Sequence, residues 1–225
     1  REAVITAETK LVTKNTDIGI SADIYNAQGK FIASMTPVKI NEQHNFTFSY
    51  KISNPALWSV DNPALYKIRF RVFIAARQMD EYETSFGIRS ISFNKDKGFF
   101  LNNKPLKIKG VCMHHDLGAL GAAFNKTAAK RQLTILKQMG CNAIRTAHNP
   151  PAPQFLDLCD EMGFLVMDEA FDMWHKKKNK FDYSRDFKDW YKKDLEDMVL
   201  RDRNHPSVFM WSIGNEIGEQ FDSTG

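Results

Sequence analysis

The apolar residues of this chain change their period at about residue 90, and this change constrains the fold more than any other feature. Before that point, apolar side chains alternate with polar or small ones, which is the pattern of strands buried on one face. No helical repeat interrupts the runs. Residues 1–90 are therefore predicted to form an immunoglobulin-like β-sandwich. The alternating runs lie at 18–24, 46–52 and 66–72, with turn residues at 26–29, 41–43 and 61–63.

After about residue 92, strand-like and helical patterns alternate. Short continuous apolar runs predict buried parallel strands, and between them apolar residues recur at helical spacing before a closing glycine, Gly140 or Gly163. A hairpin of residues 99–101 and 106–108 precedes them, with Asn102 and Asn103 in its turn because asparagine tolerates positive φ. The predicted strands are 108–112, 142–146, 164–167 and 208–213, and the predicted helices run through 129–139, 155–162 and 187–199.

Strand–helix steps of this kind build either a (β/α)8 barrel or an open doubly wound sheet. In the open sheet a Gly-x-Gly-x-x-Gly turn joins the first strand to its helix, and Gly118 and Gly121 lie too far from a helix start to form it. We therefore predict that residues 91–225 form the first half of a TIM barrel, which typically has about 250 residues. The chain opens on a strand-like pattern without Met or a signal peptide and stops after the fourth strand, so we expect it to be truncated.

Charge and composition exclude several classes of protein. The chain is 43% hydrophobic with a formal net charge of +4. Its most basic run, residues 175–180, has no second basic block near it, so a solvated loop is predicted and nucleic acid is not a predicted partner. No stretch approaches about 18 consecutive apolar residues, so no membrane span is predicted. The three cysteines, Cys112, Cys141 and Cys159, lie in apolar contexts and are predicted to be small core residues rather than disulfide partners.

Polar and ionisable residues follow every predicted barrel strand. The carboxyl ends of barrel strands form the active-site face, so these side chains are expected to converge on one mouth, where they suit a substrate rich in hydroxyl groups. Each alone is also consistent with a structural role, such as a helix cap. No His-Glu-x-x-His or paired-Cys spacing supports a zinc site; no cofactor is predicted, and a structural or activating cation stays open. The residues are His114, His115, Asp116, Arg145, His148, Asn149, Asp168, Glu169, Asp172, Asn215 and Glu216.

A series of short motifs follows from residue 86 onward. They are FGIR (86–89), KGVCMHHD (109–116), NAIRTAH (142–148), LCDEMGFLVMDE (158–169), DRNHPSV (202–208) and WSIGNE (211–216). In this order and spacing they resemble glycoside hydrolase family 2, the group of β-galactosidases, β-glucuronidases and β-mannosidases. The resemblance covers residues 86–219, and residues 1–85 fit the immunoglobulin-like domain that precedes the barrel in that family. At Cys112 and Met113 many members have Asn-Arg instead, which leaves the sugar preference open.

The resemblance implies a role for each matching residue. Glu216 matches the general acid/base at the end of the fourth strand, and Asn215 matches the residue that binds the sugar 2-hydroxyl. Arg145 matches the arginine that orients the nucleophile carboxylate, which the family places on the seventh strand and outside this chain. The remaining matches are the substrate-contacting histidines His114 and His148 and an active-site rim carboxylate, Asp168.

We therefore expect the complete protein to be a retaining exo-β-galactosidase, since residues 114–122 look more like a galactosidase than a glucuronidase. Such enzymes use two carboxyl groups about 5–5.5 Å apart, and Glu216 can act as the acid only if the nucleophile's charge and partial burial raise its pKa. β-Glucuronidase, β-mannosidase and a non-catalytic carbohydrate-binding protein on a decayed barrel are the alternatives. The expected partner is a β-linked oligosaccharide or glycoside. A homo-oligomer is compatible with the sequence, the compartment is open, and this segment alone should be inactive.

Overall fold

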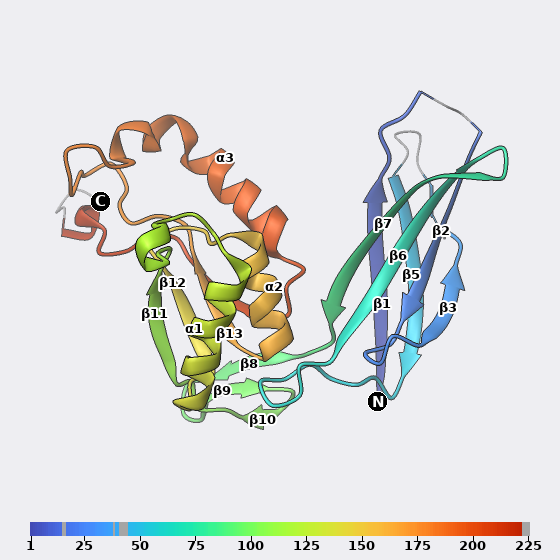
Figure 1. Ribbon diagram of the computed structural model, residues 1–225, viewed down its shortest axis with the longest axis horizontal. Coiled ribbons are helices and arrows are strands. Elements are labelled where there is room, and N and C mark those ends of the chain that lie inside the picture. Colours follow the sequence, from blue (N-terminus) through green and yellow to red (C-terminus); the bar gives the residue numbers. More distant parts are fainter. Residues whose placement is uncertain (15–16, 38, 41–44, 222–225) are drawn as a thin grey trace. The chain divides into compact units, whose positions relative to one another are not determined.

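The structure is a computed structural model that consists of two compact units (Figure 1). The first unit comprises Arg1–Trp58 and Ala64–Ile88, and the second comprises Ser59–Pro63 and Arg89–Gly225. The change of unit between Ile88 and Arg89 lies close to the predicted domain boundary at residue 90, and each unit has a hydrophobic core of its own. The residues described are 1–14, 17–37, 39–40 and 45–221.

Two antiparallel sheets make up the first unit. One has the strand order β3-β2-β6-β7 and the other the order β1-β5-β4. Two facing antiparallel sheets are the β-sandwich that the period of two predicted. The predicted turn at 41–43 lies outside the described residues. The strands are β1 (Glu2–Lys10), β2 (Ile18–Tyr25), β3 (Phe31–Met35), β4 (Lys39–Ile40), β5 (Asn45–Ser53), β6 (Leu65–Ile74) and β7 (Arg77–Gly87).

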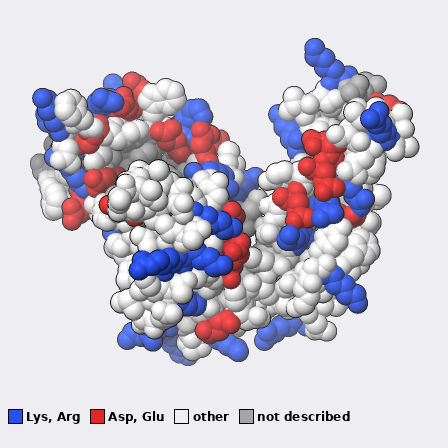
Figure 2. All heavy atoms as spheres, in the orientation of Figure 1, with Lys and Arg blue, Asp and Glu red and all other residues white. Residues whose placement is uncertain are grey.

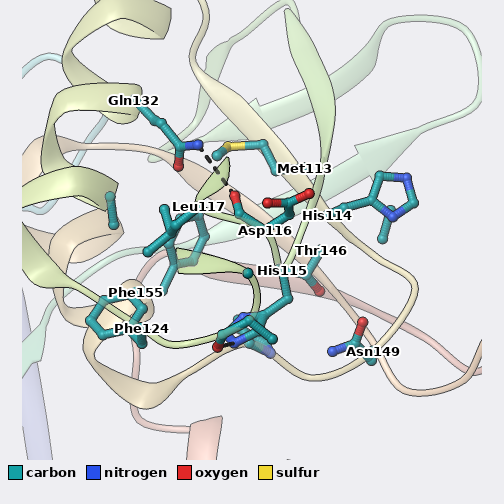
Figure 3. Close-up of a pocket in the computed structure, with 15 residues that line it drawn as sticks. Met113, His114, His115, Asp116, Leu117, Phe124, Gln132, Thr146, Asn149 and Phe155 are labelled. Atoms are coloured by element: carbon teal, nitrogen blue, oxygen red, sulfur yellow. Dashed lines mark hydrogen bonds between the residues drawn. The ribbon is translucent and has the colours of Figure 1, made fainter. Parts of the chain in front are cut away.

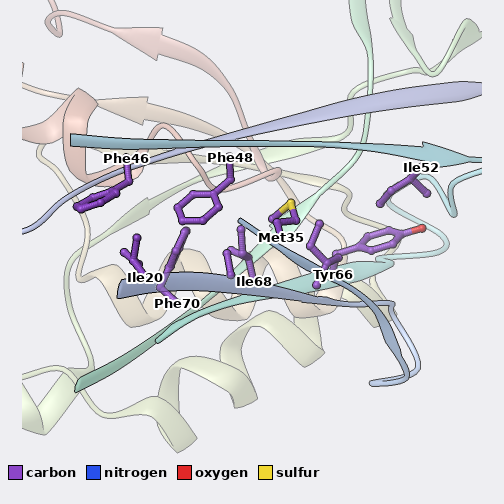
Figure 4. Close-up of a cluster of buried hydrophobic side chains, with 10 residues drawn as sticks. Ile20, Met35, Phe46, Phe48, Ile52, Tyr66, Ile68 and Phe70 are labelled. Carbon is purple, nitrogen blue, oxygen red and sulfur yellow. The ribbon is translucent and has the colours of Figure 1, made fainter. Parts of the chain in front are cut away.

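The core of the first unit lies between these two sheets, as Figure 4 shows. Every second residue of a strand points to the same face, so the alternating apolar residues of β2, β5 and β6 all point inward. Phe48 and Ile24, one from each sheet, are both fully buried. Full burial of a side chain of this size contributes about 1.5–3 kcal/mol. The remaining members of this core are Ile20, Ala22, Met35, Phe46, Ile52, Tyr66, Ile68 and Phe70.

The second unit begins with a small antiparallel sheet of order β10-β9-β8, formed by β8 (Ile91–Asn94), β9 (Gly98–Leu101) and β10 (Lys104–Pro105). The predicted hairpin turn is confirmed, because Asn102 and Asn103 have φ values of 54° and 64°. The second strand of this hairpin, β10, is two residues long and lies before the predicted range of 106–108. Rings of this sheet pack on Phe209 at the start of the fourth parallel strand, with 5.3 Å between the centroids of Phe99 and Phe209. The small sheet therefore lies at the amino ends of the parallel strands (Figure 1).

Four parallel strands in the order β11-β12-β13-β14 follow, joined by helices. This arrangement confirms the predicted half barrel and its parallel strands. The first strand starts two residues later than predicted, because the alternation of Leu106 and Ile108 with lysines before it also resembles a strand. The elements are β11 (Gly110–His114), α1 (Lys126–Gln138), β12 (Ala143–Ala147), α2 (Pro153–Met162), β13 (Leu165–Glu169), α3 (Ser184–Asp202) and β14 (Val208–Ser212).

Alternate residues of these strands point to opposite faces of the sheet. Ile144 and Val166 face the side covered by α1 and α2 (Figure 1), where they join the main core of this unit and are 1% and 0% exposed. Arg145 and Met167 are in register with each other and are only partly buried, because they lie on the opposite face. In a barrel that second face is the interior, so polar residues of the same parity reach the active-site mouth.

Helix α2 ends at Gly163, as predicted, in the left-handed conformation that closes many helices. A Cβ on this residue would lie 2.4 Å from the Val60 carbonyl oxygen, so only glycine fits. The Lys137 ammonium donates hydrogen bonds to the carbonyl oxygens of both residues, at 3.0 and 2.8 Å. This contact links the end of α1 to the turn between α2 and β13.

Candidate active site

A buried carboxylate, Glu169, is the centre of the site. It is the last residue of β13, is 0% exposed and accepts hydrogen bonds from three side chains. Arg145 binds it in a fork, with Nε 2.9 Å from Oε2 and Nη2 2.9 Å from Oε1. His148 donates from Nδ1 at 2.7 Å and Ser212 donates from Oγ at 2.6 Å. Charge-assisted, two-pronged contacts of this kind hold both partners rigidly, so Glu169 determines where the Arg145 and His148 side chains lie.

Asn215 is connected to this centre through Arg145. Its side-chain oxygen accepts a second hydrogen bond from Arg145 Nη2 at 2.9 Å, and its amide nitrogen donates to Asp172 Oδ1 at 3.0 Å. The backbone nitrogen of Asn215 donates to the carbonyl of Phe171. With both ends of its amide occupied, Asn215 is oriented before any ligand arrives.

Lys178 closes the network from the loop between β13 and α3. Its ammonium donates to Asp172 Oδ1 at 2.8 Å and to the Asn215 carbonyl oxygen at 2.8 Å. Burial raises the pKa of Asp172, but hydrogen bonds from Lys178 and Asn215 outweigh burial, and the net pKa lies below its usual range. Asp172 is therefore a fixed anion that joins the loop to the end of β14.

Glu216 lies beyond the end of β14, in a turn where its φ is +47°. Its side chain is 84% exposed, and Lys178 Nζ is 3.9 Å from Oε2. The partial burial expected from the sequence concerns the complete protein and stays a prediction. Gly214 makes this turn possible, since a Cβ there would lie 2.9 Å from Trp174 Nε1, which donates to the Ile213 carbonyl oxygen.

His114 and His148 meet edge to face at the same rim, with 5.1 Å between ring centroids and 87° between ring planes. His114 is exposed at the end of β11, and the peptide bond before His148 is cis. Because His148 donates through Nδ1 to a carboxylate, its Nε2 is left to contact a ligand. The structure thus brings seven of the predicted strand-end residues to one rim: His114, Arg145, His148, Glu169, Asp172, Asn215 and Glu216.

The loop that follows His114 encloses a small cavity (Figure 3). Leu117, Phe124 and Phe155 form its apolar side, and His114 extends away from them. Its volume is about 30 Å³, room for roughly two waters, so no sugar fits inside it. His115 donates from Nε2 to the Ala122 carbonyl at 3.0 Å, which gives it a role within the loop.

Asp168 does not reach the rim. It has the parity of Val166, so its side chain points to the helix face, where it is 0% exposed next to Asp202 of α3. Burial and the charge of Asp202 raise the pKa of Asp168 to about 7. Its Oδ2 accepts no hydrogen bond among the described residues, and when protonated this oxygen becomes a donor to Asp202. The structure therefore assigns Asp168 to the packing of α3 on the sheet.

The raised pKa predicts a pH-dependent stability. Between about pH 4 and pH 7 the folded state keeps the Asp168 proton while the unfolded state loses it, so stability falls as pH rises through this window. We expect Asp168→Asn, which keeps a donor for Asp202 without a proton to lose, to reduce this fall. The measurement is the apparent melting temperature of the complete protein at pH 5 and pH 8. Equal falls in the variant and the wild type would contradict the assignment.

At the level of sequence, Glu169 was named among the strand-end residues but was given no role in the site, and Lys178 was missed. Asp168 was chosen over Glu169 because two adjacent acids at a strand end look alike until their faces are known. The two-residue strand period places Asp168 and Glu169 on opposite faces, but which of them faces the barrel interior depends on the register of β13 with its neighbours. Lys178 was assigned to a solvated loop, and the loop is confirmed as largely exposed. Nothing in the sequence distinguishes its side chain from those of the neighbouring lysines.

The cysteines form no disulfide, as predicted, but only one of them is a fully buried core residue. Cys159 is buried and Cys141 is intermediate, whereas Cys112 is exposed, with its sulfur 3.7 Å from Arg145 Nη1. Cys112 is not buried within the described residues, since its strand register places it beside Arg145 on the face that a complete barrel encloses.

Lys and Arg side chains are interspersed with Asp and Glu on the face shown in Figure 2, so that face carries no electrostatic field of a single sign.

Two family models match this chain end to end. Residues 93–224 match the model described as "Glycosyl hydrolases family 2, TIM barrel domain", and residues 1–89 match "Glycosyl hydrolases family 2". The chain belongs to glycosyl hydrolase family 2. This membership confirms the resemblance seen in the motifs, as well as the predicted order of a β-sandwich followed by part of a TIM barrel.

The relatives of this chain in family 2 are named for activity on different sugars. The chain is 50% identical to "Beta-galactosidase BoGH2A" of Bacteroides ovatus over 98% of its length and 27% of the relative's. It is 38% identical to a "Putative beta-glucuronidase" of Formosa agariphila, over 96% of this chain and 21% of the relative. Among solved structures, a family 2 member from Bacteroides cellulosilyticus is similar with a TM-score of 0.84 at 38% identity, covering 99% of this chain and 29% of that one.

The chain thus spans about a quarter of the length of these family 2 relatives. Within the part of the chain that the structure describes, no helix is long and apolar enough to cross a membrane.

Proposed function

We propose that the complete protein carrying this chain is a retaining exo-β-galactosidase that removes terminal β-linked galactose from oligosaccharides or glycosides. The observation that supports this most directly is the rim network, in which Glu169, through Arg145, holds Asn215 immediately before an exposed acid, Glu216. A 50% identical relative named as a β-galactosidase supports the choice of sugar.

Glu216 serves as the general acid and then as the base. In a retaining glycosidase the acid protonates the glycosidic oxygen, a second carboxylate attacks the anomeric carbon, and the first group then deprotonates the incoming water. An exposed carboxylate on a rigid turn can reach both the leaving oxygen and the water. Glu169 is not suited to attack, because it is 0% exposed and both of its oxygens are occupied. The nucleophile is therefore assigned to a segment of the complete protein outside these residues.

The sugar in the reacting position would be bound by side chains that the network has already oriented. Asn215 is aligned to hydrogen-bond a ring hydroxyl, and Arg145 adds positive charge next to the expected nucleophile. His148 Nε2 and the exposed His114 ring are available for further hydroxyl groups. Groups held in place before binding lose little entropy when the substrate arrives, which favours the transition state.

β-Glucuronidase activity is the second candidate, because a 38% identical relative carries that name. β-Mannosidase remains the third sugar specificity of the family. A non-catalytic carbohydrate-binding protein is the alternative of a different class, and the intact set of Arg145, Asn215 and Glu216 argues against it.

A panel of nitrophenyl β-glycosides decides between these candidates. With the complete protein, we expect the galactoside to show the highest kcat/KM, because the leaving group is constant and only the sugar contacts differ. Faster turnover of the glucuronide or the mannoside would overturn the sugar assignment. No turnover of any glycoside, together with measurable binding of the free sugars, would favour the binding protein.

A further inference from the structure

A second pocket adjoins the rim and extends outward from it. Its walls are residues 148–150 after β12, residues 170–173 and 179–183 after β13, and Asp194 of α3. Its volume is about 690 Å³, within the range of about 300–1,000 Å³ typical of small-molecule sites. We refer to it as the lateral pocket, and it is large enough for a sugar residue.

The lateral pocket shares two residues with the rim network. His148 and Asp172 line the pocket, and the same two side chains bind Glu169 and Asn215 respectively. A molecule in the pocket would therefore lie one side chain away from a sugar bound at Asn215. The pocket is a continuation of the site rather than a separate hollow.

The lateral pocket is lined by an exposed aromatic ring, that of Phe181. Phe181 is 78% exposed, although burial of such a ring would be favourable. Lys180 Nζ lies 5.1 Å from its centroid. Behind them, Phe171 and Tyr183 are stacked with 5.4 Å between centroids. A flat apolar ring beside a hydrogen-bond donor matches a pyranose, which has an apolar C–H face and hydroxyl groups at its edge.

The acids of the pocket are already occupied. Hydrogen bonds from Ser184 and from backbone N–H groups lower the pKa of Asp182 to about 2, and Asp194 accepts a hydrogen bond from the Tyr183 hydroxyl. In contrast, the Asn179 amide side chain and the Lys180 ammonium make no hydrogen bond within the described residues. These two groups, rather than the carboxylates, are free to bind a ligand.

We propose that the lateral pocket binds the sugar residue of the leaving group, stacked on Phe181 and hydrogen-bonded by Asn179 and Lys180. This rests on the proposed function. An exo-acting enzyme holds a single sugar on the non-reducing side of the bond that breaks, and the position at Asn215 is assigned to that sugar. A second sugar-sized pocket beside it therefore belongs to the other side of the bond.

The test compares Phe181→Ala with the wild type on two substrates of the complete enzyme. One is a disaccharide that carries the sugar identified by the glycoside panel, and the other is the β-glycosyl fluoride of that sugar, whose leaving group is a single atom. We expect kcat/KM for the disaccharide to fall about tenfold, the scale of one lost stacking contact. The value for the fluoride should stay within about twofold. Phe181→Trp should retain most of the disaccharide activity, and Trp190→Ala, a half-exposed aromatic of α3 outside the pocket, should change neither substrate.

A second measurement follows transfer of the glycosyl group to an acceptor sugar, which would bind in the same pocket. The covalent intermediate of a retaining enzyme partitions between water and an added acceptor sugar, and that acceptor occupies the leaving-group position. Phe181→Ala should lower the ratio of transfer to hydrolysis. This ratio does not depend on how much of the protein is correctly folded.

The outcomes separate the two proposals. If the wild type hydrolyses neither substrate, the proposed function fails. If the wild type is active but Phe181→Ala leaves the disaccharide-to-fluoride ratio unchanged, the assignment of the pocket is wrong. A parallel loss on both substrates with a lower melting temperature would also overturn it, because it would mean that another part of the complete protein covers Phe181.

Discussion

Replacing Glu216 with Gln in the complete enzyme is expected to lower kcat for a β-galactosyl disaccharide by roughly 10² to 10⁴-fold, the usual contribution of general acid–base catalysis. The loss should be smaller for dinitrophenyl galactosides, because a good leaving group needs little protonation in the first step. Added azide, which needs no general base to attack the intermediate, should restore turnover and release galactosyl azide. Rates on the two substrate classes, with and without azide, provide the measurement.

The fold of this variant should be unchanged. The Glu216 side chain is 84% exposed, and the charged group beside it, Lys178, is 3.9 Å away, a contact that contributes little at the surface. Glu196→Gln, at an exposed position on α3, is the matched control and should leave both rates as in the wild type. Equal losses for good and poor leaving groups, without azide rescue, would refute the acid/base assignment.

Replacing Arg145 with Met is expected to have the largest effect on stability. The change removes the forked partner of Glu169, which is 0% exposed, and leaves a buried charge whose remaining side-chain donors among the described residues are His148 and Ser212. Breaking a buried ion pair from one side costs about 3–5 kcal/mol. Asn215 also loses the donor to its side-chain oxygen, so activity should fall with stability. Urea unfolding of the complete protein provides the measurement.

Two further variants identify the cause of this loss. Glu169→Gln in the Arg145→Met background removes the unpaired charge, so the double variant should be more stable than Arg145→Met alone. Arg145→Lys keeps the positive charge but cannot make the two-pronged contact, so it should retain stability better than it retains activity. A double variant that is less stable than Arg145→Met would show that the stability of this region does not depend on the buried charge.

The types of element in this chain could be predicted from the sequence because the signals are local. Alternation at 18–24 and 66–72 marks strands whose inner residues, such as Ile24 and Ile68, are indeed buried. Gly163 and Gly140 both have positive φ at the ends of their helices, as a closing glycine should. The same local reading misplaced the start of β11 by two residues, since residues 106–109 before it alternate apolar and charged side chains as a strand does.

The choice between neighbouring residues at the site depended on the tertiary structure. Asp168 and Glu169 are adjacent acids, yet one faces α3 and the other faces Arg145. Which face each takes follows from the register of β13 with β12 and from the irregularity at Val166 and Met167 where β13 pairs with β14. Register is a long-range property, because a shift of a single residue would exchange the two faces.

The sequence by itself determined the family, the order of the two folds and the residues at the strand ends, since these depend on motifs and periods within short stretches of chain. Only the tertiary structure showed that Glu169 holds Arg145 and His148, that Lys178 ties the loop to Asn215, and that Phe181 lines a pocket beside them. Each of these contacts joins segments well separated in sequence. Their geometry follows from how the strands and helices pack, which no local pattern records.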